Sequence, residues 1–170
     1  VLSSDSIANT YSSVKSSNNI IKNIKADEIE KFVSLSSTIG GYIIFPSERI
    51  NNQMTINGAR GINKKIRDRF DLTLECIRRY YREEDNPLNE TLKRYSSFFK
   101  LFVNFQGYVD FFLLQDLVDN NYSKIKYFIP FKNFEESPLP DDTNHYKLYK
   151  ENLSIFVVSR NERIKNFRFS

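Results

Sequence analysis

The stretch that decides the fold is Ile62–Arg82, INKKIRDRFDLTLECIRRYYR. At the helical spacing of about 100° per residue, its apolar side chains gather on one arc and its charged side chains on the opposite arc. The apolar arc holds Ile62, Ile66, Phe70, Thr73, Leu74, Ile77, Tyr80 and Tyr81. This pattern predicts one long helix over 62–82 that packs on a core. Leu72 falls within the charged arc, so we expect that face to be partly covered as well.

Two further stretches predict what packs against this helix. Asn86-Pro87 is typical of a helix start, and the following apolar residues recur every three or four positions. The segment Tyr108–Val118, YVDFFLLQDLV, is apolar on every side, so we expect it to be buried all round. A common core is therefore predicted from Phe70, Leu74, Ile77, Leu92, Tyr95, Phe99, Phe111 and Leu114.

The rest of the chain predicts further helices and a few short strands. Residues 20–38 have helical spacing, whereas 42–45 and 125–129 are typical of strands that end at prolines. A last helix begins at Asp141 or Asp142, and one of its faces carries Tyr146, Tyr149, Leu153, Phe156, Arg160, Ile164 and Phe167. We predict one α+β domain over 1–170, mostly helical, with a loop-rich lead-in at 1–19. Because the chain begins with valine and not with methionine, we expect it to be either a fragment that lacks an N-terminal segment or a processed product.

Composition excludes several classes of protein. The 170 residues are 40% hydrophobic and 27% charged, as in soluble globular proteins. No apolar run approaches the ~18 residues of a membrane span, and the first residues do not resemble a signal peptide. Because Cys76 is the only cysteine, an intrachain disulfide and a multi-cysteine metal site are excluded. We therefore predict a cytoplasmic protein without a membrane partner.

Several long motifs carry a resemblance to a known family. They are Phe45-Pro46, Thr55–Gly61 (TINGARG), Asp68–Arg79 (DRFDLTLECIRR) and Tyr108–Val118. With them, the chain from Leu2 through Arg163 resembles a family of uncharacterised bacterial proteins, a domain of unknown function. The resemblance implies that further residues precede Leu2 in family members. It implies no activity, so the sequence leaves open whether the protein is an enzyme. We predict no cofactor.

The first candidate site is an anion site formed by Asn57, Arg60 and Lys64. Two glycines flank Arg60, and the three side chains precede or open the predicted long helix. Backbone N–H groups at a helix start, together with a guanidinium, favour a phosphate. Residues 60–82 carry eight Lys and Arg against three Asp and Glu, so their net charge suits an anionic partner. The alternative is a turn in which asparagine caps the helix and the arginine binds carbonyl groups.

The second candidate is a divalent metal site formed by Asp68, Asp71 and Glu75. On one helix, carboxylates three and four residues apart share a face, and oxygen ligands suit Mg²⁺ or Mn²⁺. The same spacing also places cations beside each acid, which favours the alternative of an ion-pair lattice. The cations that would form this lattice are Lys64, Arg67, Arg78 and Arg79.

The third candidate is a pair of acids, Asp110 and Asp116, within the segment predicted to be buried. A buried carboxylate must find a partner or become neutral. We therefore expect at least one of the two to pair with an arginine, for which Arg60, Arg69 and Arg78 are the candidates. The alternative is a catalytic acid with a raised pKa.

Two weaker sites have structural explanations. A nucleophilic pair of Cys76 and His145 would place a thiolate beside a base, but the cysteine falls near the apolar arc and the histidine among polar neighbours. The second weaker site would bind nucleic-acid bases by stacking them on Tyr80 and Tyr81, next to Arg82. Both tyrosines fall on the apolar arc, so we expect them to pack internally.

Together these sites predict a binding module for an anionic partner, either nucleic acid or a nucleotide-like phosphate. The first alternative is a metal-dependent, phosphate-processing enzyme that uses the three carboxylates with Arg60 or Arg78. A further alternative is a structural subunit whose basic face binds an acidic protein.

Overall fold

The structure is a computed structural model and describes residues 1–168. Two strands, β1 (Leu2–Ser6) and β2 (Tyr42–Pro46), form an antiparallel sheet in which Leu2 faces Pro46 and Ser6 faces Tyr42. Ile43 and Phe45 are buried, whereas Tyr42 and Ile44 are exposed. Because side chains alternate along a strand, one face of the sheet lies on the core and the other remains open. The predicted strand at 42–45 is therefore present, and part of the predicted lead-in forms its partner.

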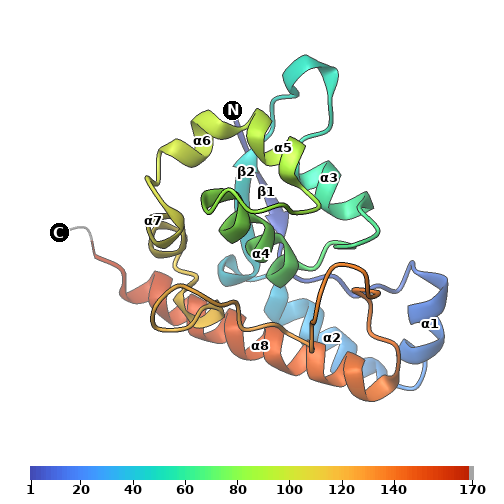
Figure 1. Ribbon diagram of the computed structural model, residues 1–170. Coiled ribbons are helices and arrows are strands. Elements are labelled where there is room, and N and C mark those ends of the chain that lie inside the picture. Colours follow the sequence, from blue (N-terminus) through green and yellow to red (C-terminus); the bar gives the residue numbers. More distant parts are fainter. Residues whose placement is uncertain (169–170) are drawn as a thin grey trace.

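Helices surround this small sheet (Figure 1). After β1 come α1 (Lys15–Ile21), α2 (Ala26–Ser36) and the 3₁₀ turn η1 (Ile39–Gly41). The long helix α8 (Thr143–Asn166) runs along one side of the molecule and packs against all three. In the described part of the chain, no helix is both long and apolar enough to cross a membrane.

The predicted single helix over 62–82 is wrong, because the chain turns inside it. After the 3₁₀ turn η2 (Ile50–Asn52), the structure has two helices, α3 (Ile56–Ile62) and α4 (Phe70–Tyr81). The Asn63 side chain accepts a hydrogen bond from the Lys65 N–H, which favours a turn over a continuing helix. Asp68 therefore does not lie on the helix that carries Asp71 and Glu75.

Three short helices follow α4, namely α5 (Asn89–Arg94), α6 (Ser96–Lys100) and α7 (Phe105–Phe111). The predicted core is confirmed for all of its members except Phe111, which is 69% exposed. The all-round burial expected for 108–118 is also wrong, because α7 ends at Phe111. The chain then turns through Leu113 into the 3₁₀ turn η3 (Gln115–Leu117). Residues 125–129 form no strand and make one isolated bridge, between Ile125 and Val118.

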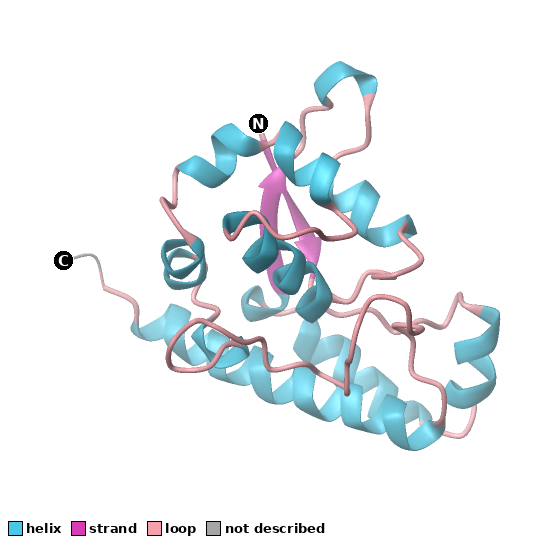
Figure 2. Cartoon of the chain, in the orientation of Figure 1, coloured by secondary structure: helices cyan, strands magenta, loops and turns pink. Residues whose placement is uncertain are grey.

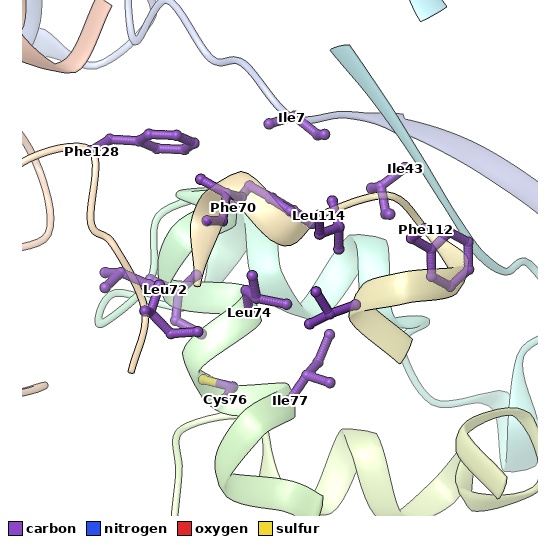
Figure 3. Close-up of a cluster of buried hydrophobic side chains, with 14 of the residues drawn as sticks. Ile7, Ile43, Phe70, Leu72, Leu74, Cys76, Ile77, Phe112, Leu114 and Phe128 are labelled. Carbon is purple, nitrogen blue, oxygen red and sulfur yellow. The ribbon is translucent and has the colours of Figure 1, made fainter. Parts of the chain in front are cut away.

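One hydrophobic core contains the buried residues of α4 together with Ile43 and Phe45 of the sheet, whose strands are seen among the helices in Figure 2. Every residue from Phe70 to Ile77 is buried, so Leu72 on the charged arc is covered as predicted. Figure 3 shows Leu74 and Ile77 of α4 near Leu114, with Ile43 of β2 above them. The predicted α+β fold, mostly helical with short strands, is confirmed.

Candidate functional site

The guanidinium of Arg60 lies inside the protein and is bound to protein atoms. Its Nη1 lies 2.6 Å from an oxygen of Asp5 and 2.9 Å from an oxygen of Asp68. Its Nε donates to Thr73 Oγ1 at 3.0 Å, and the side chain is fully buried. The anion site predicted at Arg60 is therefore wrong, because its guanidinium already forms ion pairs with two carboxylates of the protein. Of its predicted companions, Asn57 donates to Ser3 of β1 and Lys64 lies exposed beyond the end of α3.

The three carboxylates of the predicted metal site each have an arginine partner. Asp68 pairs with Arg60, and Asp71 accepts two hydrogen bonds from Arg69. Glu75 accepts from Arg78 and Arg79. The sequence offered an ion-pair lattice as the alternative, and of the four cations predicted for it Arg78 and Arg79 take part. Among the described residues, Lys64 and Arg67 do not, because Arg60 and Arg69 pair with Asp68 and Asp71 instead. In the part of the chain that the structure describes, the side chains that gather at metal-ligand distances lie elsewhere, at the start of α8, and are those of Asp141, Asp142 and His145.

The prediction that Asp110 or Asp116 pairs with an arginine is correct for Asp116, but the partner differs. Arg163 of α8 donates to both oxygens of Asp116, at 2.7 and 2.9 Å. Arg60, Arg69 and Arg78 are not its partners, because they pair with Asp5, Asp71 and Glu75, respectively. Both aspartates are only half-buried.

Asp116 lacks the property predicted for a catalytic acid. The hydrogen bond from Arg163 lowers the pKa of Asp116, which is opposite to the raised pKa that such an acid needs. Asp110 accepts from the Tyr122 hydroxyl at 2.8 Å and from Gln115 Nε2 at 3.1 Å. These two acids therefore have structural partners.

The two weaker candidates also have structural roles. Cys76 is buried, and burial raises the pKa of its thiol, so it is not an activated nucleophile. His145 lies beside Asp141 at the surface. Tyr80 and Tyr81 both stack on Phe99, and the Tyr81 hydroxyl donates to the Phe99 carbonyl at 2.6 Å. The tyrosines therefore pack internally, as expected.

The side chain that the predicted sites did not include is Arg160, on the inner face of α8. It is 6% exposed, and its Nε donates to the Phe112 carbonyl at 3.0 Å. Its Nη1 donates to the carbonyls of Gly40 at 3.0 Å and Tyr42 at 2.5 Å. The only sequence signal for this position is that an arginine falls on the otherwise apolar face of the last helix.

A glycine allows this arrangement. A side chain at Gly40 would lie 2.7 Å from both the Val157 carbonyl and Asn161 Oδ1, so η1 can sit directly on α8 only because residue 40 lacks one. The Gly40 N–H donates to Asn161 Oδ1 at 2.8 Å. This close approach holds the Gly40 carbonyl against Arg160.

Arg160 differs from the other fully internal arginines in its electrostatics. Arg60 and Arg69 each contact a carboxylate within 3 Å, whereas Arg160 contacts only neutral carbonyl groups among the described residues. Burial without a nearby carboxylate lowers the pKa of Arg160 to about 10. At neutral pH the guanidinium is still charged, so the protein keeps an uncompensated positive charge below its surface.

A pocket of about 480 Å³ opens next to this charge. It lies between the open face of the sheet, the end of α7 and the C-terminal part of α8, whose relative positions are seen in Figure 1. Apart from Arg160 and Ser4 its walls are mainly apolar, formed by Ile39, Tyr42, Ile44, Phe111, Phe112, Leu113 and Ile164. The Nη2 atom of Arg160 has no hydrogen-bond partner among the described residues. It is therefore the nitrogen that remains for a ligand in the pocket.

A family model matches residues 1–164 of the chain. The chain belongs to the family of unknown function DUF6994. This confirms the resemblance to a domain of unknown function that the sequence motifs indicated. No curated protein and no solved structure matches the chain. Membership of DUF6994 therefore brings no activity to the chain, and function must be argued from its geometry.

One wall of the pocket in this DUF6994 protein is held in a strained backbone conformation. Leu113 has a φ of 55°, the left-handed region that usually takes glycine at the end of a helix. Its N–H donates to the Asp110 carbonyl and the Leu114 N–H donates to the Val109 carbonyl, which together end α7. Leu113 also lines a second hollow of about 490 Å³, which shares Phe111 and Ile164 with the first. The strained residue thus lies where the two hollows meet.

Proposed function

We propose that this chain is a binding module whose ligand carries an anionic group that pairs with Arg160. The observation that carries the proposal is a buried guanidinium that has no carboxylate partner within residues 1–168, at the wall of an apolar pocket. A buried charge is costly unless it is paired, so an anion in the pocket would remove a cost that the free protein bears.

The geometry gives less support to nucleic acid as the partner. Of the eight cations in residues 60–82, six form ion pairs within the described chain, and only Lys64 and Arg67 do not. This basic segment therefore offers few free charges to a phosphate backbone. Metal-dependent phosphate chemistry also has little support, because Asp68, Asp71 and Glu75 already pair with arginines. A cytoplasmic location stays a prediction.

Thermal unfolding in different salts tests the proposal. The full chain would be unfolded in chloride, acetate, hexanoate and inorganic phosphate at equal ionic strength and pH 7. At least one of the last three should raise Tm relative to chloride. A ligand at ten times its Kd adds about 1.4 kcal/mol, or several degrees for a domain of this size.

Two variants assign the effect to one residue. Arg160→Gln should abolish the rise in Tm, whereas Arg163→Gln, which removes a charge from the same helix, should keep it. Equal Tm values of the unsubstituted chain in all four salts would contradict the proposal, and this comparison does not depend on whether Arg160→Gln folds.

A further inference from the structure

The ligand class can be narrowed from the shape and polarity of the pocket, and this step rests on the function proposed above. We infer that the ligand is a linear apolar monocarboxylate, with its carboxylate at Arg160 and its alkyl chain along the groove between α7 and α8. The groove is the pair of adjoining hollows that share Phe111, Leu113 and Ile164.

The polar groups at the groove fit a single carboxylate head. Of the described residues that line the two hollows, Arg160 is the only cation, and its Nε and Nη1 are already bound to carbonyl groups. This leaves Nη2, with the Ser4 hydroxyl as a second possible donor on the same pocket. A nucleoside diphosphate or triphosphate would bring several charges to this one cation, so most of them would stay unpaired.

The groove also disfavours a second charge on the ligand. The hollow farther from Arg160 is lined by Asp110 and by the apolar side chains of Ile164 and Phe167. An anionic group at that end would lie near the carboxylate of Asp110, and like charges repel. A ligand with one anionic end and one apolar end is therefore favoured over a dicarboxylate.

An alkyl chain suits the groove better than a peptide does. Each peptide residue brings an N–H and a C=O that need partners, and the lining offers few polar groups to supply them. A peptide could instead pair with the edge of β2, but the Tyr42 carbonyl already accepts from Arg160. Methylene groups need no such partners and gain from contact with exposed Ile39, Ile44 and Phe111.

Calorimetric titration of the full chain with a homologous series tests this inference. The probes are hexanoate, octanoate and decanoate below their micelle concentrations, with the alcohols of equal length, suberate, inorganic phosphate and ATP. We expect one site per chain and a Kd that falls about fourfold per added methylene. The alcohols, the dicarboxylate suberate and ATP should each bind at least tenfold more weakly than octanoate.

A pair of surface variants locates the binding site without touching Arg160. Phe111→Ser removes an exposed wall of the groove and should raise the Kd for octanoate at least fivefold. Leu101→Ser removes a similarly exposed side chain, at 74%, that lines neither hollow, and should leave the Kd unchanged.

The outcomes separate this inference from the proposed function. If phosphate or hexanoate binds but longer chains bind no more tightly, the alkyl groove is wrong and the anion site at Arg160 stands. If ATP or suberate binds best, the ligand class is wrong in the same way. If octanol binds as tightly as octanoate, or no probe binds, the anion site itself fails. If Phe111→Ser and Leu101→Ser change the Kd for octanoate equally, the alkyl chain of the ligand binds elsewhere on the protein.

Discussion

Arg60 and Arg160 bind the two strands of the sheet at one and the same pair of facing residues. Arg60 Nη1 donates to the Ser6 carbonyl at 3.4 Å and Arg160 Nη1 donates to the Tyr42 carbonyl at 2.5 Å, and Ser6 faces Tyr42. In a pair of this kind the two carbonyls point away from each other, so the arginines lie at opposite edges. Among the described residues, carboxylates lie beside Arg60 but not beside Arg160. An arginine therefore binds each edge of the sheet, and within the described part of the chain only the one at the β2 edge has no anionic partner.

Replacing Phe99 and replacing Phe111 should have different effects on the free energy of unfolding. Phe99→Ala should lower the free energy of unfolding by about 3–5 kcal/mol, because the ring is fully buried among other aromatic rings. Phe111→Ala should change it by less than about 1 kcal/mol, since that ring is mostly exposed. Urea unfolding of both variants checks this, and equal losses would show that α7 packs differently.

The buried ion pairs of Glu75 make stability depend on pH. Burial opposes ionisation of Glu75, but hydrogen bonds from Arg78 and Arg79 outweigh it and hold its pKa below the ordinary value of 4.5. Its stabilising contribution is therefore complete above pH 4.5 and is lost as the pH falls through the lowered pKa. Glu75→Gln should cost about 2–4 kcal/mol at pH 7, and progressively less below pH 4.5.

A matched substitution controls this experiment. Glu135→Gln removes a carboxylate whose pair with Lys65 is exposed, so it should have no measurable effect on unfolding at either pH. A difference between Glu75→Gln and the unsubstituted chain that stays constant from pH 7 to pH 3 would contradict the assigned direction of the pKa shift.

The pair of Asp116 and Arg163 should contribute little to stability, because both side chains are partly exposed. Asp116→Asn should lower the free energy of unfolding by at most about 1 kcal/mol. Chemical denaturation at low and high salt checks this, since screening should shrink the difference. A loss of 3 kcal/mol or more would mean that the acid is buried, as the sequence had suggested.

Replacing Leu113 by glycine should raise the stability of the protein and weaken its binding of octanoate. Leu113→Gly relieves the left-handed backbone and should raise the free energy of unfolding by up to about 1 kcal/mol. Because the side chain lines both hollows, the same variant should bind octanoate more weakly. Val103→Gly is the control: φ is 69° and the residue is 84% exposed, so stability should rise without an effect on binding. Unchanged binding by Leu113→Gly would remove this residue from the site.

Local patterns in the sequence predicted much of the fold. The spacing of apolar residues located the buried faces of α4 to α6, and Leu72 indicated that the charged arc was covered. The same spacing missed the turn after Ile62, because Asn63 ends α3 through a side-chain bond that periodicity does not register. Phe111 was misplaced for a similar reason, since α7 ends there and the chain reverses at Leu113.

The site was harder to predict because its partners are distant in the chain. The guanidinium of Arg60 binds Asp5, which lies 55 positions away in a segment that the sequence predicted to be a loop. Arg160 binds carbonyls 48 to 120 positions away, and a main-chain carbonyl carries no sequence signal. An uncompensated charge can be recognised only once every neighbour is placed. The sequence therefore predicted an anion site at an arginine whose guanidinium is already paired with two carboxylates.

The most direct test of the central claim observes the Arg160 side chain itself. The guanidinium N–H signals of the folded protein would be followed by NMR as octanoate is added at constant ionic strength, with octanol as the neutral control. We predict that the Arg160 signals shift and saturate at one ligand per chain with octanoate, while those of Arg60 do not move. Arg160 signals that stay unchanged at saturating octanoate would contradict the account.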